Sequence, residues 1–453
     1  MIMNDVDGKE KPLVDIRGIS KELFHNVTFK SFLAKTATVI FHVLLSALCG
    51  TILLTGVYSL PVERIKNNVG LSAYTMQWEG SYYVLSDHCT SQLDNYTDSI
   101  MLLEAAHNHQ NSAIVDAMNA PRGYVEDNED PSKTLVLHFI EKKDFAGSLN
   151  YPRYWHGYLV FLKPLLMLFV YRTIRFINGF LQFTIVAFTC LLLFKKGFKK
   201  YIIPYVLAYF MLMPIALAKS LQFSSCFYVF SLACIALLTA NTDNLKKRSH
   251  MIFLYCGITT AFFDLLTYPV STVGVPLVFY LVLADFDSLE QKLSDIIKNG
   301  LCWSLGFGGM WISKWIIGSI ITKNNVILDA INATMFRVSS VAADGIQYNA
   351  FTSTIKNYAD FFKTPITLIV AAYIIYLSYR CIKKDRSTAN NCFRTILPYL
   401  LCGFIPAVWY ALTINHSATH SWFTNKACVV SVLAIMFGLI SLMTSFSRAK
   451  DRQ

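Results

Sequence analysis

Two aspartates that stand four residues apart, Asp94 and Asp98, are the residues best suited to chemistry in this chain. They lie in QLDNYTDSIML, residues 92–102, at the edge of an apolar run. On a helix this spacing puts both carboxylates on one face, where either could act as a general base toward a hydroxyl group. The same pattern is typical of a helix start, with Asp94 as the N-cap and Asp98 in the first turn. The sequence leaves both interpretations open and does not decide which aspartate would be the base.

Lys314 is the cation with the clearest signal, because it lies inside an apolar run, residues 301–321. A charge at that depth is costly and is usually functional or paired, so we expect Lys314 to hold a lipid phosphate. The alternatives are snorkelling to the headgroups or an ion pair with Asp264. Further positive charge, which suits an anionic ligand at the same boundary, comes from Lys163, Arg153 and Arg172.

A late polar turn carries His416 and His420, whose spacing puts both rings on one face of a helix. Two such histidines could bind zinc, but no third ligand completes the set, so no metal site is predicted. Hydrogen bonding to a phosphate or a sugar suits the pair better. The other interpretation is a hydrated turn with no role.

An aromatic cluster, YPRYWHGY at residues 151–158, contains Tyr154, Trp155 and His156. These residues could form a surface for a sugar, but the same composition is typical of any membrane-interface belt. The ends of other apolar runs supply the remaining candidate contacts to a sugar or an acceptor, which are Lys219, Asp264 and Asn415.

The elements that must position these residues are membrane helices. The chain is 54% hydrophobic and only 15% charged, which is too apolar for an ordinary soluble protein. Its net charge of +11 comes from short basic clusters between apolar runs. This is the pattern of cytoplasmic membrane loops, so no nucleic-acid partner is predicted. Phosphate-binding loop motifs are absent from the sequence.

We therefore predict an all-α polytopic membrane protein with about ten transmembrane helices. Residues 1–35 form a cytoplasmic segment, and 36–453 form the membrane domain, with both termini inside. A large external loop, 61–157, follows the first span and includes a possible strand at 134–139. A second external segment, 322–363, has apolar residues at roughly helical spacing and could lie along the membrane. The predicted spans are 36–60, 176–194, 201–218, 226–240, 251–266, 268–284, 301–321, 365–379, 396–412 and 427–443.

Three functions fit these features. An enzyme at the outer membrane boundary would use a carboxylate as base, cations for a phosphate leaving group and a groove for a lipid tail. A polytopic transporter or flippase for a lipid-linked or anionic substrate would need polar groups near the membrane centre, and the predicted spans hold few. An outward-facing acyltransferase would use His156 or His416 as base, but no specific spacing supports it.

The topology and two motifs resemble the GT-C superfamily of integral membrane glycosyltransferases. LDNYTD, residues 93–98, occupies the place of the acidic motif in that family's first external loop. YALTINHSATHSWFT, residues 410–424, is similar to a turn in bacterial glucosyltransferases that modify O-antigen during serotype conversion. The resemblance covers the overall plan and these two patches.

This resemblance implies inverting transfer of one sugar from a polyprenyl-phosphate carrier to a glycan or lipid-linked glycan acceptor. It implies a bacterial inner (plasma) membrane protein that needs no cofactor, with Asp94 or Asp98 as base. Lys314, Lys163, His416 and His420 would contact the carrier phosphate, and Tyr154 and Trp155 would lie near the sugar.

Overall fold

The computed structural model describes residues 2–4, 10–12, 14–24, 28–241, 244–341, 345–384 and 389–450, so the predicted cytoplasmic segment 1–35 lies partly outside the described residues. Most of the described chain is helical. The strands form two short antiparallel pairs, β1 (Ile2–Asn4) with β2 (Glu10–Pro12) and β3 (Arg122–Tyr124) with β4 (Gly147–Leu149).

The first half of the chain forms the helices α1 (Ile16–Phe24), α2 (Phe29–Tyr58), α3 (Glu63–Glu79), α4 (Asn95–Ala106), α5 (Ala113–Asn119), α6 (Pro131–Leu135), α7 (Leu159–Leu168), α8 (Tyr171–Lys195), α9 (Ile202–Met211) and α10 (Pro214–Lys219). The second half forms α11 (Leu221–Thr239), α12 (Leu245–Phe263), α13 (Ser271–Leu283), α14 (Leu289–Thr322), α15 (Val326–Val338), α16 (Ala350–Phe361), α17 (Ile366–Lys384), α18 (Ala389–Leu412), α19 (Ile414–Thr419), α20 (Ser421–Thr424) and α21 (Val429–Lys450).

Within the described ranges, six helical segments are long and apolar enough to cross a membrane: 29–58, 171–195, 221–239, 366–383, 392–412 and 421–446. The chain is therefore a helical membrane-type protein, with fewer evident spans than the sequence predicted. The predicted span 201–218 is divided into α9 and α10 at Met213, which has φ +56° and precedes Pro214. The predicted span 268–284 contains only the 13 residues of α13.

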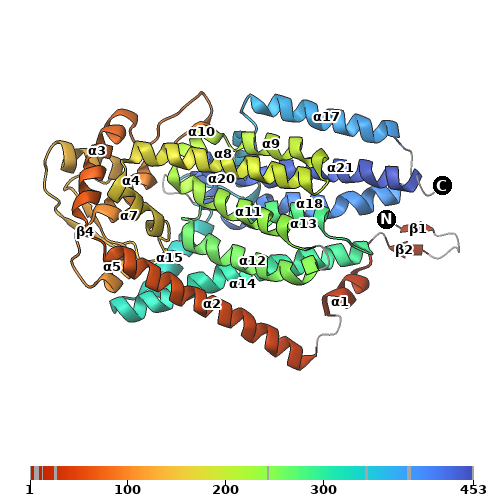
Figure 1. Cartoon of the computed structure of the whole chain (residues 1–453), viewed down its shortest axis with the longest axis horizontal. Helices are drawn as coiled ribbons and strands as arrows, with labels where there is room; N and C mark the ends of the chain where they lie inside the picture. Colours follow the sequence, from red (N-terminus) through yellow and green to blue (C-terminus); the bar gives the residue numbers. More distant parts are fainter. Residues whose placement is uncertain are drawn as a thin grey trace.

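The long helices lie side by side along the molecule (Figure 1). At one end lies the segment 61–157, called here the cap, which contains α3 to α6 and the β3–β4 pair. At the opposite end lie α1 and the last residues of α21. The prediction of a strand at 134–139 is wrong, because α6 and a π-helical turn (Val136–Ile140) occupy these residues. Asp130 caps α6 by accepting from the Ser132 N–H at 2.8 Å, and Pro131 favours the first helical position.

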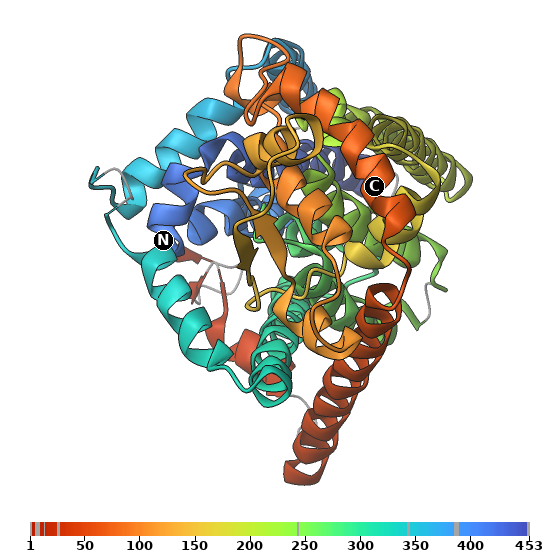
Figure 2. The same cartoon turned by 90° about the vertical axis from the view of Figure 1, so that its left-hand side faces the viewer.

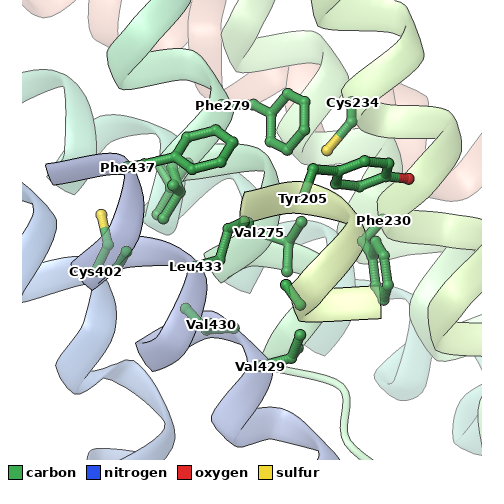
Figure 3. Close-up of a cluster of buried hydrophobic side chains, with 14 of the residues drawn as sticks. Tyr205, Phe230, Cys234, Val275, Phe279, Cys402, Val429, Val430, Leu433 and Phe437 are labelled. Carbon is green, nitrogen blue, oxygen red and sulfur yellow. The ribbon is translucent and has the colours of Figure 1, made fainter. Parts of the chain in front are cut away.

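Two hydrophobic cores hold the cap and the bundle together. The larger core lies among α9, α11, α13, α18 and α21, where Phe279 packs against Tyr205 and Phe437 (Figure 3). The second core joins α2, α3, α4, α7 and α12 and so fixes the cap on the bundle. Helices α12 and α14 approach closely, because a Cβ atom at Gly257 would lie 2.1 Å from the Trp303 carbonyl oxygen.

Candidate active site

The first turn of α11 is the point at which the aspartates meet. The Asp98 carboxylate accepts the Leu221 N–H at 2.7 Å and the Gln222 N–H at 3.1 Å, and the Tyr171 hydroxyl also donates to it. These N–H groups belong to a helix start, where they have no partner within the helix. A carboxylate is well stabilised at such a position. Asp98 therefore joins α4 to α8 and α11, and both of its oxygens are used.

Asp94 lies one turn earlier, at the N-cap of α4. Its carboxylate accepts the Thr97 N–H at 3.1 Å and the Thr97 hydroxyl at 2.9 Å, and the side-chain amide of Gln222 also donates to it. The backbone N–H of Asp94 donates to the Ser220 hydroxyl at 3.0 Å. The prediction of a helix start is thus confirmed, and it places the carboxylate next to a second helix start, that of α11.

Burial raises the pKa of both aspartates above the usual value for this residue. Desolvation raises the pKa of Asp94 to about 7, and the nearby charge of Asp98 adds to the rise while hydrogen bonds from Thr97 oppose it. Desolvation raises the pKa of Asp98 to about 6, against the hydrogen bond from Tyr171 and the charge of Arg175. A base works best when its pKa lies near the working pH. Both pKa values lie near neutral pH, where either carboxyl group could exchange a proton.

Asp264 is a third buried carboxylate at the same place. It follows α12 and accepts the Ser225 hydroxyl at 3.1 Å and the Thr267 N–H at 2.9 Å, and the Thr267 hydroxyl also donates to it. Burial raises its pKa above the usual range. The turn that carries Asp264 is held by His416, whose Nε2 lies 2.7 Å from the Leu266 carbonyl oxygen.

The two histidines of the late turn are brought together with these aspartates. The His416 and His420 rings lie 5.1 Å apart, and His420 stacks on Phe423, which packs on Phe223 of α11. Desolvation lowers the pKa of His420 to about 4 and that of His416 further below its usual value, and the Arg337 charge contributes to both shifts. Both rings are therefore neutral at pH 7. The described residues contain no group of three side chains able to hold a metal ion.

Arg337, which the sequence analysis did not select, is the cation beside this turn. It reaches from α15 and donates to the Tyr154 hydroxyl at 2.8 Å. Tyr154 in turn packs against Trp311, with ring centroids 5.0 Å apart. Three side-chain nitrogens here are buried without a hydrogen-bond partner, the donors Arg337 Nε and Trp311 Nε1 and the ring nitrogen His420 Nδ1. Unpartnered buried donors are rare in proteins, so this group suits an anion.

A second polar cluster surrounds Glu104, a fully buried residue of α4. Glu104 Oε2 accepts the Tyr158 hydroxyl at 2.5 Å and lies 3.1 Å from His156 Nδ1, which is 2.7 Å from the same hydroxyl. His156 Nε2 faces the Tyr151 carbonyl oxygen at 2.7 Å and so carries a hydrogen. The three side chains therefore form one hydrogen-bonded cluster in the protein interior.

The two lysines predicted to hold phosphate lie in this second cluster. Lys314 Nζ donates to the Met118 carbonyl oxygen at 2.9 Å, so it neither snorkels nor pairs with Asp264. Lys163 Nζ lies 4.5 Å from the Tyr58 ring centroid and has no hydrogen-bond partner. Both side chains are fully buried. The Glu104 charge acts on Lys314, whereas the Asp116 charge acts on Lys163.

The remaining predicted site residues have other roles. Trp155 is buried and donates to the Met310 carbonyl oxygen at 2.8 Å, so its ring belongs to the core. Arg153 forms an ion pair with Asp329 at 2.8 Å. The remaining three are Arg172, which is exposed, Lys219, whose carbonyl oxygen accepts from Tyr171 at 3.3 Å, and Asn415, which donates to the Phe336 carbonyl oxygen at 2.9 Å.

An apolar groove of about 720 Å³ ends beside these carboxylates. Its walls come from α7, α8, α11 and α12, and its lining is almost wholly hydrocarbon. At one end the lining includes Tyr158, Leu221 and Ser225. Each of them donates a hydrogen bond to a buried carboxylate: Tyr158 to Glu104, Leu221 to Asp98 and Ser225 to Asp264. The groove thus connects three carboxylates to an apolar channel that is large enough for a sizeable ligand.

The chain matches no family model, no curated protein and no solved structure in the comparisons made with known proteins.

Proposed function

We propose that this protein is a membrane glycosyltransferase that moves one sugar from a polyprenyl-phosphate carrier to a glycan acceptor. The observation that supports it most is the apolar groove, whose lining includes Leu221 and Ser225 of the first turns of α11. Leu221 donates to Asp98, Ser225 donates to Asp264, and Gln222, which lies between them in sequence, donates to Asp94. A long hydrocarbon tail would fill the groove, and its polar head would then lie beside a buried base. The resemblance of residues 93–98 and 410–424 to GT-C enzymes points to the same chemistry.

In this proposal Asp94 takes the proton from the acceptor hydroxyl. The acceptor oxygen attacks the anomeric carbon from the face opposite the phosphate, and the bond from that carbon to the phosphate oxygen breaks. The lipid phosphate leaves with the bonding electrons, so the configuration at the sugar is inverted. Arg337, whose Nε–H has no partner, would stabilise the leaving group, and the neutral ring of His420 would assist if its hydrogen is on Nδ1.

Asp98 is a positioning residue in this proposal, because all three of its donors come from α8 and α11, so that it joins these helices to α4. It holds the start of α11, and with it Gln222, against Asp94. The finer topology is part of the same proposal. Helices α12 to α14 and the α9–α10 pair would complete about ten spans, with the cap on the outer face of a bacterial inner membrane and both termini in the cytoplasm.

The test uses purified protein in liposomes, a panel of radiolabelled polyprenyl-phosphate sugars and a lipid-linked glycan acceptor. We expect wild type to consume one donor, and Asp94→Asn to lose transfer while keeping its fold. Asp360→Asn, which changes an aspartate outside the site, is the matched control. Ala236→Phe narrows the groove and should raise the KM for long-chain donors more than for short-chain donors. Wild type that consumes no donor would refute the proposal.

A transporter or flippase for a lipid-linked substrate is the second candidate, because the groove alone would also suit lipid passage. A transporter or flippase would move a fluorescent lipid across the vesicle membrane without any transfer of sugar, which distinguishes it from the glycosyltransferase. The acyltransferase alternative loses support, because both ring nitrogens of His156 are engaged and the Nε2 atom of His416 is used by the Leu266 carbonyl.

A further inference from the structure

Helix α15 presents an apolar face that no part of the described chain covers. Val326, Ala330 and Arg337 face the protein. On the opposite face Leu328, Ile331 and Met335 are 52%, 47% and 64% exposed. Exposed apolar area costs roughly 25 cal/mol per Å² in water, so a continuous stripe of this kind points to a contact surface.

The orientation of α15 restricts what this surface meets. Figure 2, which views the molecule from the cap end, shows α15 and α16 extended across the view, whereas α14 is seen nearly along its axis. The 13 residues of α15 span only about 20 Å at the rise of an α-helix, against roughly 30 Å for a membrane core. The helix is therefore too short to cross a membrane and is turned across the bundle.

Neighbouring helices also expose apolar side chains. On α14, which precedes α15 by three residues, the exposed apolar residues Leu305, Ile312, Ile316 and Ile320 share one face. On α16, Phe351 and Ile355 are 73% and 51% exposed. A lipid surface would cover exposed apolar side chains on all three helices.

We infer that α15 and α16 lie in the membrane interface at the cap end, and that lipid contact holds Arg337 over Tyr154. Other contacts of α15 connect it to the candidate site. Arg337 donates to Tyr154, Asp329 pairs with Arg153, and the Phe336 carbonyl oxygen accepts from Asn415. Lipid is then a structural partner of the candidate site. This inference goes beyond the proposed function and does not depend on sugar transfer.

Depth-dependent quenching tests this placement. The full chain carries a fluorescent noncanonical amino acid at Met335 and is reconstituted in phosphatidylcholine vesicles with a nitroxide on the headgroup or deep in the acyl chain. We expect at least twofold stronger quenching by the headgroup nitroxide. A label at Glu126, an exposed residue of the cap, should be quenched by neither. Stronger quenching by the deep nitroxide would overturn the inference. No quenching at Met335 would also overturn it, because protein or a second copy of the chain would then cover this face.

A pair of glutamine variants tests the role of the apolar face. Ile331→Gln places a polar group on the stripe, whereas Asn332→Gln changes a neighbouring exposed residue that is already polar. We expect headgroup quenching at Met335 to fall by half or more in Ile331→Gln and to stay unchanged in Asn332→Gln. Thermal unfolding midpoints verify that both variants fold. Equal quenching in the two variants would show that the stripe does not dock the helix.

Discussion

Replacing Asp94 with asparagine should abolish sugar transfer and at the same time stabilise the protein above neutral pH. Asparagine is as good an N-cap as aspartate. The side-chain oxygen of asparagine can still accept the Thr97 N–H, and its NH₂ group can donate to the Thr97 hydroxyl. The same NH₂ group can donate to the side-chain oxygen of Gln222 once the Gln222 amide flips by 180°. The fold therefore loses little. A general base contributes roughly 10²- to 10⁴-fold to a rate, and we expect a loss of that size.

The gain in stability follows from the raised pKa of Asp94. Burial raises this pKa from 3.8 to about 7, so the folded state favours the protonated acid. Below about pH 4 both states are protonated and the carboxyl has no effect on folding. As pH rises toward 7 the unfolded chain ionises first, and the cost to folding grows to about 4 kcal/mol, since each tenfold change in proton affinity is worth about 1.4 kcal/mol. Asparagine removes this cost.

The assay is thermal unfolding of purified wild type and Asp94→Asn at pH 5 and pH 8. An unfolding entropy of about 2.1 cal/mol/K per residue gives roughly 1 °C per kcal/mol for a chain of this length, so the variant should unfold on the order of 4 °C higher than wild type at pH 8. Most of that gain should be absent at pH 5. Asp360→Asn should behave in the opposite way, because burial of Asp360 is outweighed by Lys363 and Lys356, which lower its pKa.

If Asp94→Asn lowered the midpoint by the same amount at both pH values, Asp94 would be an ordinary cap and the argument for a strained base would fail. If the variant kept full transfer at every pH while gaining stability, the carboxylate would be strained but would not be the base. The proposed enzyme would then need another proton acceptor.

Asp98→Ala should leave the Leu221 and Gln222 N–H groups without an acceptor, at roughly 1–3 kcal/mol each. Asp98→Asn keeps one acceptor and should cost less; the thermal midpoints of the two variants check this order. Glu104→Gln should keep most of the transfer rate, because the amide oxygen can still accept from the Tyr158 hydroxyl; a loss as large as that in Asp94→Asn would make Glu104 the base. Arg337→Met should lower kcat/KM for the donor about tenfold or more, because a charge-assisted hydrogen bond is worth about 1.5–3 kcal/mol; an unchanged kcat/KM would remove Arg337 from the phosphate site.

The sequence allowed the helix start at Asp94 to be predicted, because capping residues have a local signature. It also placed the aspartates in a polar segment after the first apolar run, and the structure has them in the cap at the end of the bundle. The partner of Asp98 could not be predicted in this way. The Leu221 and Gln222 N–H groups are backbone atoms, and nothing in their residue types indicates that a carboxylate 123 positions away will accept from them.

Lys314 shows the limit of arguments from depth alone. The expectation that a buried lysine holds a ligand follows from its cost, but the Met118 carbonyl oxygen, which belongs to the far end of α5, accepts its proton instead. Arg337 shows the reverse error, because a helix with apolar spacing gave no reason to select the one cation on its inner face. The missing information in both cases is how elements pack that lie far apart in sequence.

The different surroundings of Asp94 and Asp98 explain how one motif could supply both a general base and a positioning residue. Asp98 meets a hydroxyl and two N–H groups of a helix start, all from other elements, so its charge is compensated and its position is fixed. Asp94 receives most of its hydrogen bonds from its own capping turn and has the higher pKa of the two. Titratable pairs whose environments separate their pKa values are where acid–base roles are assigned. The helix pitch sets the four-residue spacing of the two aspartates. The start of α11 distinguishes them, because its backbone N–H groups donate to Asp98, whereas only the Gln222 side chain donates to Asp94.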